Sequence, residues 1–411
     1  MKNKINLIDL FVGCGGLSDG FEQTGRYNTI ACVEWEKAPC LTLTNRLKSK
    51  WKYENADQIV LQFDIQRTDE LINGWVNDPL YGSNIGLEEI VKGSNQKIDV
   101  IIGGPPCQAY SIAGRIRDEK GMTDDYRNFL FESYLKVVDH FQPKLFIFEN
   151  VPGILSAKPG GIPITERISK SLDKIGYEVI SDLREALIDS SLYGVPQARN
   201  RMVIIGVNKS LIKGNGQIAL EDFYHEIITQ YYSDKKYTVK DAIKDLPSLY
   251  PLSEIEKHEG RNYSHEYKKS KILNHIPRMH NQRDIKIFKL LADDIQEGVN
   301  KYATSDALID LYYEVTGRKT NVHKYHVLRW NKLSNTIPAH LYKDGLRHIH
   351  PDPRQARSIT VREAARLQSF DDDFEFLGSM TDQYKMIGNA VPPKFAKAIA
   401  LAIEKFIDKY F

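Results

Sequence analysis

A cysteine at position 107 has the setting of a reactive thiol. The apolar stretch 100–102 has the character of a short buried strand, and the segment Gly103–Pro106 ends it with two glycines and two prolines. The prolines fix two φ angles and stiffen the backbone directly ahead of the thiol. Because α/β sheets bind ligands beyond the carboxyl ends of their strands, Cys107 is predicted to be a nucleophile. An inert buried thiol is the alternative, and it suits Cys32 and Cys40, which lie in or beside apolar runs.

An acid and an amide follow a second apolar stretch. Residues 144–148 are predicted to form a buried strand, and Glu149 and Asn150 come directly after it. The carboxyl ends of parallel strands share one edge of a sheet, so Glu149 is expected to face the same rim as Cys107. Partial burial would raise the pKa of Glu149, which suits proton donation. An acid in a surface turn is the competing interpretation.

Two arginines stand where a later strand is predicted to begin, at residues 202–207. Arg199 and Arg201 alternate with other residues, so both side chains are expected on one face of that strand. Two guanidinium groups at a sheet edge suit contact with an anion or with the edge of a base. A pair of salt bridges would explain the same pattern.

A glycine-rich turn near the N-terminus suggests a nucleotide site. The segment 13–16 joins a predicted strand at 5–11 to a helix, and Glu34 ends the next predicted strand, 18 residues beyond Gly16. Glycines admit a ligand to the backbone, and an acid at this distance can take ribose hydroxyls. The spacing is not that of a dinucleotide-binding turn. It favours an adenosine-type cofactor without a pyrophosphate over a surface acid beside a tight turn.

Strands and helices alternate along the first half of the chain. The predicted strands are 5–11, 27–34, 61–64, 99–102, 144–148, 177–183 and 202–207. The predicted helices include 129–140, 165–175, 360–367 with a capping box at its start, and 394–411 returning to the first domain. This alternation is typical of an α/β fold with a doubly wound, mostly parallel sheet. It fails after Val207, where a second domain is expected.

Length and composition fit a two-domain protein. At 411 residues the chain is long enough for two cores, and no run of about eighteen apolar residues predicts a membrane span. The first apolar segment is too short for the core of a signal peptide. Four cysteines with no Cys-x-x-Cys pair do not make a disulfide framework, so a reducing compartment is expected.

The net charge of +2 is unevenly distributed. Residues 206–356 hold 24 Lys and Arg against 19 Asp and Glu, and ten of the eleven histidines. Within them, residues 257–289 hold nine basic residues against three acids, with Tyr263, Tyr267 and two histidines (275 and 280) interleaved. Such a mixture suits nucleic acid, while a solvated charged surface explains it about as well. The histidines lack the spacing of metal ligands, and no metal is expected.

Six motifs, in chain order, resemble those of the DNA (cytosine-5) methyltransferase family, and the resemblance spans nearly the whole chain. The motifs are Asp9-Leu10-Phe11-x-Gly13-x-Gly15-Gly16, Gly104-Pro105-Pro106-Cys107-Gln108, Glu149-Asn150-Val151, Gln197-x-Arg199-x-Arg201, Arg362-Glu363-x-Ala365-Arg366-Leu367-Gln368 and Gly388-Asn389-Ala390-Val391-Pro392-Pro393.

The resemblance implies a catalytic set. Cys107 would add to C6 of cytosine and make C5 nucleophilic, and protonated Glu149 would stand beside N3. Asn150 would hold the loop and the base, and Arg201 with Arg199 would contact the O2 side. The base that removes the C5 proton is not identified. A charged loop at 115–127 would close over the flipped nucleotide, although a solvated connection fits its composition nearly as well.

The resemblance also implies S-adenosyl-L-methionine as cofactor and S-adenosyl-L-homocysteine as product. Phe11 and Trp35 would enclose the adenine, Glu34 would hold the ribose, and Asp64 would meet the adenine amino group. The remaining cofactor contacts would be Gly13, Gly15, Pro106, Leu130 and Asn389.

The expected organisation is a catalytic methyltransferase domain at 1–205 plus 380–411 and a smaller target-recognition domain at 206–379. The resemblance implies a compact, monomeric, bacterial-type modification enzyme that acts on double-stranded DNA in the cytoplasm. A cognate restriction endonuclease acting separately is a possible partner, and the sequence does not decide whether one exists. Methylation of tRNA by the same family is the first alternative. A nicotinamide oxidoreductase would leave Cys107 and Glu149 unexplained, and a DNA-binding protein without catalysis would not need them.

Overall fold

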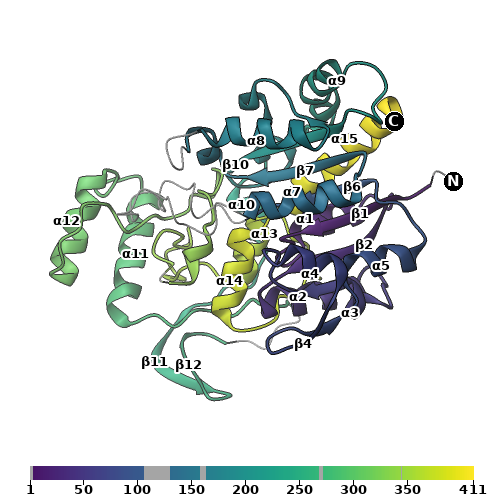
Figure 1. Ribbon diagram of the computed structural model, residues 1–411. Helices are drawn as coiled ribbons and strands as arrows, with labels where there is room; N and C mark the ends of the chain where they lie inside the picture. The colour runs from purple at the N-terminus through teal and green to yellow at the C-terminus, as the bar shows by residue number, and fades with distance from the viewer. Residues whose placement is uncertain (1–2, 106–129, 158–162, 268–271, 344) are drawn as a thin grey trace. The chain divides into compact units, whose positions relative to one another are not determined.

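The computed structural model forms two compact units (Figure 1). Unit 1 is Met1–Gly194, Arg199–Asp234 and Ala390–Phe411, and unit 2 is Val195–Ala198 and Lys235–Asn389. The residues that the structure describes are 3–105, 130–157, 163–267, 272–343 and 345–411.

Unit 1 is built on an eight-stranded sheet. Its strands are, in spatial order, β3 (Val60–Gln62), β2 (Tyr27–Glu34), β1 (Ile5–Leu10), β6 (Val100–Gly103), β7 (Leu145–Asn150), β10 (Asn200–Asn208) and β8 (Tyr177–Glu178), with β9 (Leu187–Asp189) also paired to β10. The strands from β3 to β7 are parallel, and β10 is antiparallel to its neighbours. A separate hairpin joins β4 (Trp75–Asp78) and β5 (Gly82–Asn84). The predicted α/β class with a mostly parallel sheet is confirmed.

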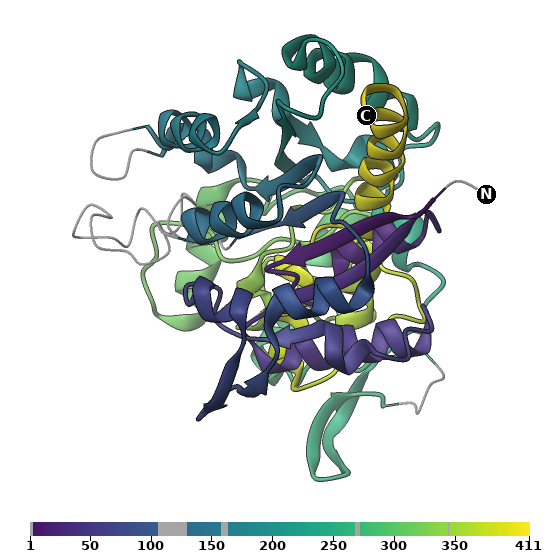
Figure 2. The ribbon, with the colours of Figure 1, turned by 45° about the vertical axis from the view of Figure 1, so that its right-hand side comes forward.

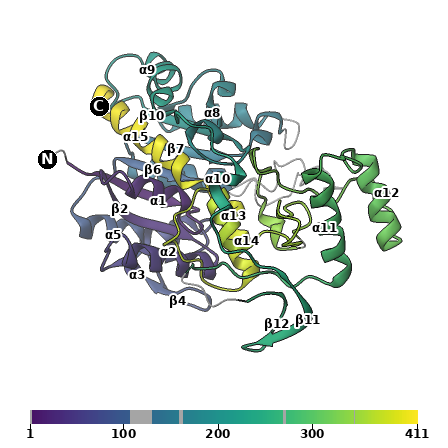
Figure 3. The ribbon, with the colours of Figure 1, turned by 180° about the vertical axis from the view of Figure 1, so that it is seen from behind.

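Helices cover both faces of this sheet: α7 lies over one face in Figure 1, and α15 lies over the other in Figure 3. The helices of unit 1 are α1 (Gly16–Glu22), α2 (Lys37–Ser49), α3 (Ala56–Ile59), α4 (Thr68–Asn73), α5 (Gly86–Ser94), α7 (Leu130–Phe141), α8 (Ile164–Lys174), α9 (Gly216–Asp222) and α15 (Pro393–Tyr410). Among the helices described in either unit, none combines the length and apolar character that a membrane span requires.

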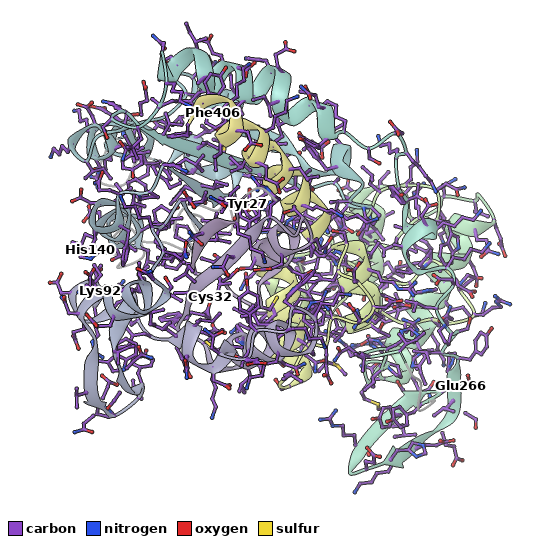
Figure 4. All side chains as sticks on the ribbon, turned by 90° about the vertical axis from the view of Figure 1, so that its right-hand side faces the viewer. Tyr27, Cys32, Lys92, His140, Glu266 and Phe406 are labelled. Carbon is purple, nitrogen blue, oxygen red and sulfur yellow. The ribbon has the colours of Figure 1, made fainter. Side chains whose placement is uncertain are left out.

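The last helix of the chain completes the core of the first unit. The helix that ends at the C-terminus lies beside the purple N-terminal elements in Figure 2. Tyr27 of β2 donates a hydrogen bond of 2.8 Å to the Ala400 carbonyl, and Phe406 packs edge to face on Phe223 (Figure 4). At Gly20 of α1 an added Cβ would lie 2.4 Å from that of Ala396, so α1 and α15 approach closely because Gly20 has no side chain.

Several expected boundaries differ from the structure. β7 continues through Asn150, because Glu149 and Asn150 pair with β10. The strand expected at 177–183 is limited to Tyr177–Glu178, since only these residues pair with β10. Asp64 lies beyond β3, which ends at Gln62.

The boundaries between the two units also differ from the expected ones at residues 206 and 380. Residues 206–234 belong to unit 1, because β10 runs through Asn208 in the sheet and Phe223 packs on α15. Residues 380–389 belong to unit 2, where the Gln368 side chain donates to the Ile387 carbonyl at 2.7 Å.

Unit 2 consists of helices, one hairpin and irregular segments. Its elements are α10 (Val239–Ile243), β11 (Pro251–His258), β12 (Arg261–His265), α11 (Gln282–Gln296), α12 (Ser305–Thr316), α13 (Val361–Leu367) and α14 (Met380–Asn389). Its apolar core joins α11 to α12 through residues such as Phe288, Leu291 and Leu311. The predicted capping box is confirmed, since Thr360 and Glu363 bond reciprocally at the start of α13.

The histidines interleaved among the basic residues of 257–289 are internal. His275 contacts the Thr360 hydroxyl at 3.0 Å, and His280 accepts a hydrogen bond of 3.2 Å from the Ser358 backbone. Both are buried. They are therefore part of the core of unit 2. The sequence pattern allowed them to stack on bases, but buried side chains are not available for that. Three of the basic residues (Lys268, Lys269 and Lys271) lie outside the described residues.

A buried ion pair anchors α13. The Arg357 guanidinium donates two hydrogen bonds of 2.7 Å to the two carboxylate oxygens of Glu363, and both side chains are at most 1% exposed. The pKa of Glu363 lies well below its usual range, because attraction to Arg357 and nearby histidines outweighs the effect of burial. The ionised carboxylate is therefore part of the folded state.

Replacing Glu363 with Gln is expected to lower the free energy of unfolding of unit 2 by about 3–5 kcal/mol, because the Arg357 charge loses its buried partner. Urea denaturation monitored by circular dichroism measures this loss. Since the folded pKa is depressed, the stabilisation is present above the ordinary carboxyl pKa and is lost as the pH falls towards the folded value. The difference between the two proteins should therefore narrow in acid.

Asp293→Asn is a matched control, because Asp293 pairs with Lys289 on the exposed face of α11 at 2.6 Å. Loss of an exposed pair four residues apart costs about 0.3–0.5 kcal/mol. Equal losses for the two variants would show that burial adds nothing to the Arg357–Glu363 pair.

Candidate active site

The order of the strands creates a topological switch point at the carboxyl edge of the sheet. From β1 the chain continues outward to β2 and β3, while β6 lies on the other side of β1 and leads to β7. Leu10 is level with both Val33 and Gly103, and Gly103 is level with Phe148. The residues that follow these four strands therefore share one edge at a topological switch point, where open α/β sheets bind ligands.

The glycine-rich turn after β1 leaves its backbone accessible. Gly13 has φ +57° and no atom within 4 Å of an added Cβ, so the space beside it is open. Gly15 has φ +89°, and an added Cβ would lie 2.5 Å from Leu43 Cδ1. The first glycine can thus admit a ligand, and the second is required by the turn itself.

Glu34 holds this turn against the end of β2. Its Oε2 accepts a hydrogen bond of 2.9 Å from the Gly13 N–H, and its Oε1 accepts from the N–H groups of Trp35 and Glu36. Burial raises the pKa of Glu34, and the backbone hydrogen bonds oppose that rise. Trp35 is 46% exposed beside it, and Phe11 adopts φ +57° at the end of β1. The open glycine is therefore held by the Glu34 carboxylate, and an aromatic residue stands beside each partner in the chain, Phe11 before Gly13 and Trp35 after Glu34.

Asp9 is a further acid of this region that the sequence pattern did not single out for a role. It is buried in β1, bonded to the Ser18 hydroxyl of α1. Burial raises its pKa to about 8, and the neighbouring charge of Glu34 adds to the rise. The signal that could have revealed it is an acid inside an otherwise apolar strand, directly before a glycine turn.

The remaining predicted cofactor residues are more dispersed. Asp64 lies after β3 and accepts a hydrogen bond of 3.0 Å from the Gln66 backbone. Leu130 is buried at the first described residue of α7. Asn389 ends α14 and is the last residue of unit 2. Pro106 lies outside the described residues.

The predicted catalytic acid is brought together with both arginines. Glu149 and Arg201 lie on the paired strands β7 and β10, and Arg201 Nε is 2.9 Å from Glu149 Oε1. Arg199, just before β10, is buried and donates to the Ala390 carbonyl at 2.9 Å. Burial raises the pKa of Glu149, and attraction to Arg201 and Arg199 opposes the rise without cancelling it.

The start of the Pro-Pro-Cys segment lies directly beside this acid. A Cβ added to Gly104 would be only 2.8 Å from Glu149 Oε2, so the absence of a side chain there leaves room for the carboxyl. Asn150 Nδ2 donates to the Pro105 carbonyl at 3.5 Å, which ties β7 to the same segment. Cys107 itself and the loop 115–127 lie outside the described residues.

The fold and this edge define an α/β protein with a glycine turn held by Glu34 and a second buried acid, Glu149, after a neighbouring strand. The chain belongs to the C-5 cytosine-specific DNA methylase family, whose model matches residues 5–75 and 81–405. It is therefore a methyltransferase, and the family expected from the six motifs is confirmed.

Individual relatives cover the chain along almost its full length. It is 34% identical to the type II methyltransferase M.Bpa9945I of Bacillus paralicheniformis, over 98% of this chain and 99% of the relative. It is 31% identical to the type II methyltransferase M1.HphI of Haemophilus parahaemolyticus, over 98% and 87%. Among solved structures, a prophage-encoded E. coli protein described as a DNA modification methyltransferase matches with a TM-score of 0.61 and 26% identity, over 99% and 100% of the two chains.

Proposed function

We propose that this chain is a DNA (cytosine-5-)-methyltransferase of a type II restriction-modification system. It transfers a methyl group from S-adenosyl-L-methionine to C5 of a cytosine that is flipped out of a specific double-stranded DNA sequence. The whole-chain family match and the type II relatives support this assignment. The single observation that carries the chemistry is the buried Glu149 carboxyl against Gly104, where the segment leading to Cys107 begins.

The reaction needs a nucleophile and an acid because C5 of cytosine is not nucleophilic on its own. The Cys107 thiolate forms a bond to C6, and the displaced electron pair is accommodated as Glu149 gives a proton to N3. C5 of the resulting enamine would then take the methyl group as the methyl–sulfur bond breaks, with S-adenosyl-L-homocysteine as the leaving group. Loss of the C5 proton to a base, departure of the Cys107 thiolate and return of the N3 proton to Glu149 restore the neutral aromatic ring.

The residues around the glycine turn fit S-adenosyl-L-methionine, which supplies an electrophilic methyl group when bound. Gly13 leaves open space, and the Glu34 carboxylate beside it suits ribose hydroxyls. Trp35 and Phe11 offer aromatic surface for the adenine ring. Gly15, Asp64, Pro106, Leu130 and Asn389 complete the proposed set.

The neighbours of Glu149 have proposed roles in holding the base. Arg201 and Arg199 would contact the O2 side of the cytosine, which is an acceptor suited to guanidinium donors. Asn150 would keep the Pro105–Cys107 segment aligned with the acid, as its bond to the Pro105 carbonyl supports.

The same proposal assigns partners to the chain. Unit 2 would be the target-recognition domain, and the substrate would be duplex DNA in the cytoplasm. The enzyme would act as a monomer, with a cognate endonuclease working separately on the same sequence. Unit 2 supports this role because it spans Lys235–Asn389, a size suited to a DNA-reading module.

Methylation of mixed-sequence duplex DNA with S-adenosyl-L-methionine, followed by bisulfite sequencing, tests the proposal. Methylated cytosines in one short sequence context are the expected result. A folded, cofactor-binding protein that methylates no duplex DNA would overturn the DNA assignment and make tRNA the substrate to examine.

Replacing Gly104 with Ala is expected to lower kcat by about 10²-fold, the cost of displacing a catalytic group by roughly 1 Å. The new Cβ would crowd Glu149 Oε2, which is the far end of a flexible side chain, so the carboxyl moves and the fold remains. Single-turnover methylation measures the rate, and thermal unfolding checks the fold.

Gly93→Ala in α5 is the matched control, because nothing lies within 4 Å of the Cβ it would add. It should leave the methylation rate unchanged. A Gly104→Ala enzyme with the rate of the wild type would mean that the position of the Glu149 carboxyl does not limit catalysis.

A further inference from the structure

Unit 2 contains a cavity of about 430 Å³ that the proposed chemistry does not use. It lies where the start of α11, the end of α12 and the segment around Lys343 come together. The two helices lie side by side in Figures 1 and 3, joined by the apolar core beneath the cavity. All lining residues belong to unit 2.

The lining carries an excess of positive charge. Its cations are Arg278, Arg283, Arg318 and Lys343. Its single carboxylate is that of Asp284, which already accepts a hydrogen bond of 3.0 Å from Arg283. His280 also lines the cavity, but burial lowers its pKa to about 3, so it adds no charge near neutral pH.

The cations of the cavity differ in how they are held, and two of them, Arg318 and Lys343, are available to a ligand. Arg278 is held by a 3.0 Å hydrogen bond to the Leu341 carbonyl and lies 4.6 Å from the centre of the Tyr384 ring. Arg318 and Lys343 are exposed, and neither has a carboxylate partner among the residues that the structure describes. The cavity therefore joins anchored cations at its wall to free cations at its surface.

Most charged groups of the lining are hydrogen-bond donors, four cations against one carboxylate. Hydroxyl-bearing residues (Tyr312, Thr316 and Tyr325) make up the rest of its polar lining apart from His280. The edge of a base pair presents both donors and acceptors, whereas a phosphate presents only acceptor oxygens and a negative charge. The composition of the cavity thus matches a phosphate better than a base edge.

We propose that this cavity is a seat for the phosphate backbone of the DNA substrate, with Arg318 and Lys343 as its sequence-independent contacts. The inference rests on the proposed function and assigns a partner group to a named set of residues. Phosphate contacts fix orientation and affinity but carry no sequence information directly. The cavity would therefore set how tightly the DNA is held, and other residues would decide which sequence is methylated.

The test compares two double variants with the same change in charge. Arg318→Gln with Lys343→Gln removes the two free cations of the cavity. Lys286→Gln with Lys319→Gln removes two exposed cations of the same unit that do not line it. Fluorescence anisotropy of labelled duplexes, with and without the methylated sequence, gives affinity over a series of salt concentrations.

The cavity variant is expected to weaken binding to both duplexes by the same factor, at least about tenfold at moderate salt. The slope of log K against log salt should become shallower by about 2, one for each phosphate that the protein no longer neutralises. The control variant should change affinity less than about twofold, because it acts only through screened charge. Bisulfite sequencing should give the same methylated context for all proteins.

Equal salt slopes for the two variants would overturn the assignment, and so would a change in the methylated sequence. Loss of inorganic phosphate binding with unchanged DNA binding would also overturn it, because the cavity would then serve a free anion. A wild-type protein that binds no duplex DNA would instead overturn the proposed function.

Discussion

Replacing Cys107 with Ser is expected to reduce methyl transfer to duplex DNA by a factor on the order of 10⁴ or more, the scale of losing a covalent nucleophile. A hydroxyl is a far weaker nucleophile than a thiolate near neutral pH, so the bond to C6 would not form at a useful rate. Transfer of a labelled methyl group under single-turnover conditions measures this loss. Binding of S-adenosyl-L-methionine should persist, because the residues that follow β1 and β2 are unchanged.

Cys32→Ala provides the matched control, since Cys32 is fully buried in β2 and packs among apolar side chains. Burial holds the pKa of its thiol well above the usual range, so it has no nucleophilic role. This variant should lose some stability and keep the methylation rate per folded molecule. A Cys107→Ser enzyme as fast as the wild type would exclude a covalent step at this residue.

A second measurement tests the covalent bond directly. DNA that carries 5-fluorocytosine has no C5 proton to release, so the final elimination would stall. The Cys107 sulfur would then remain bonded to C6, and mass spectrometry of the digested complex should locate the adduct on the peptide containing that residue. An adduct on another residue would reassign the nucleophile.

Local signals were sufficient for the parallel half of the sheet. The strand at Ile5–Leu10 is a continuous apolar run closed by a glycine turn, and the strand at Tyr27–Glu34 is rich in β-favouring residues and ends on an acid. Such buried strands are specified by their own composition. The helix after Thr360 was equally clear, because a capping box depends on residues three apart.

Contacts between residues far apart in the chain determine the features that the sequence pattern does not predict. Glu149 and Asn150 lie inside β7, because Val203 and Met202 of β10 pair with them from more than fifty positions away. The shared core of unit 2 has the same origin. Gln197 and Gln368 come from two separate motifs, and their side chains bond to each other at 3.0 Å. Neither contact has a local signal.

The candidate site shows the same division between local and distant information. The spacing of Glu34 to the glycine turn predicts a ribose contact, which stays a prediction, and the structure shows that the Glu34 carboxylate accepts a hydrogen bond from the Gly13 N–H. The sequence pattern does not predict the importance of Gly104, because that importance arises from the approach of Glu149 on a neighbouring strand. For the histidines at 275 and 280 the sequence pattern allowed contact with nucleic acid, but both side chains are buried. A polar composition cannot show which side chains are buried.

Replacing Glu149 with Gln is expected to lower kcat by about 10²–10⁴-fold, the range for loss of a general acid. The amide keeps the shape of the side chain and an N–H donor, but it has no proton to give to N3. Glu226→Gln, at an exposed position of the same unit, should leave kcat unchanged. Single-turnover methylation across a pH series distinguishes the two variants.

The pH dependence follows from the direction of the shift at Glu149. Its pKa is raised mainly by burial, so the protonated form persists to higher pH than in an ordinary carboxyl. Activity of the wild type should rise as the Cys107 thiol ionises and fall as the pH passes the raised pKa of Glu149. The Glu149→Gln enzyme should keep the rising limb and lose the falling one.

Arg201 gives this interpretation a further check, because its charge opposes the rise at Glu149. Removing that charge in Arg201→Gln should raise the pKa of Glu149 further and move the falling limb to higher pH, in addition to any loss of base contact. A falling limb that stays in place in this variant, or that persists in Glu149→Gln, would assign it to another group. If the falling limb moves to higher pH in Arg201→Gln and is missing in Glu149→Gln, the group that titrates on this limb is the Glu149 carboxyl.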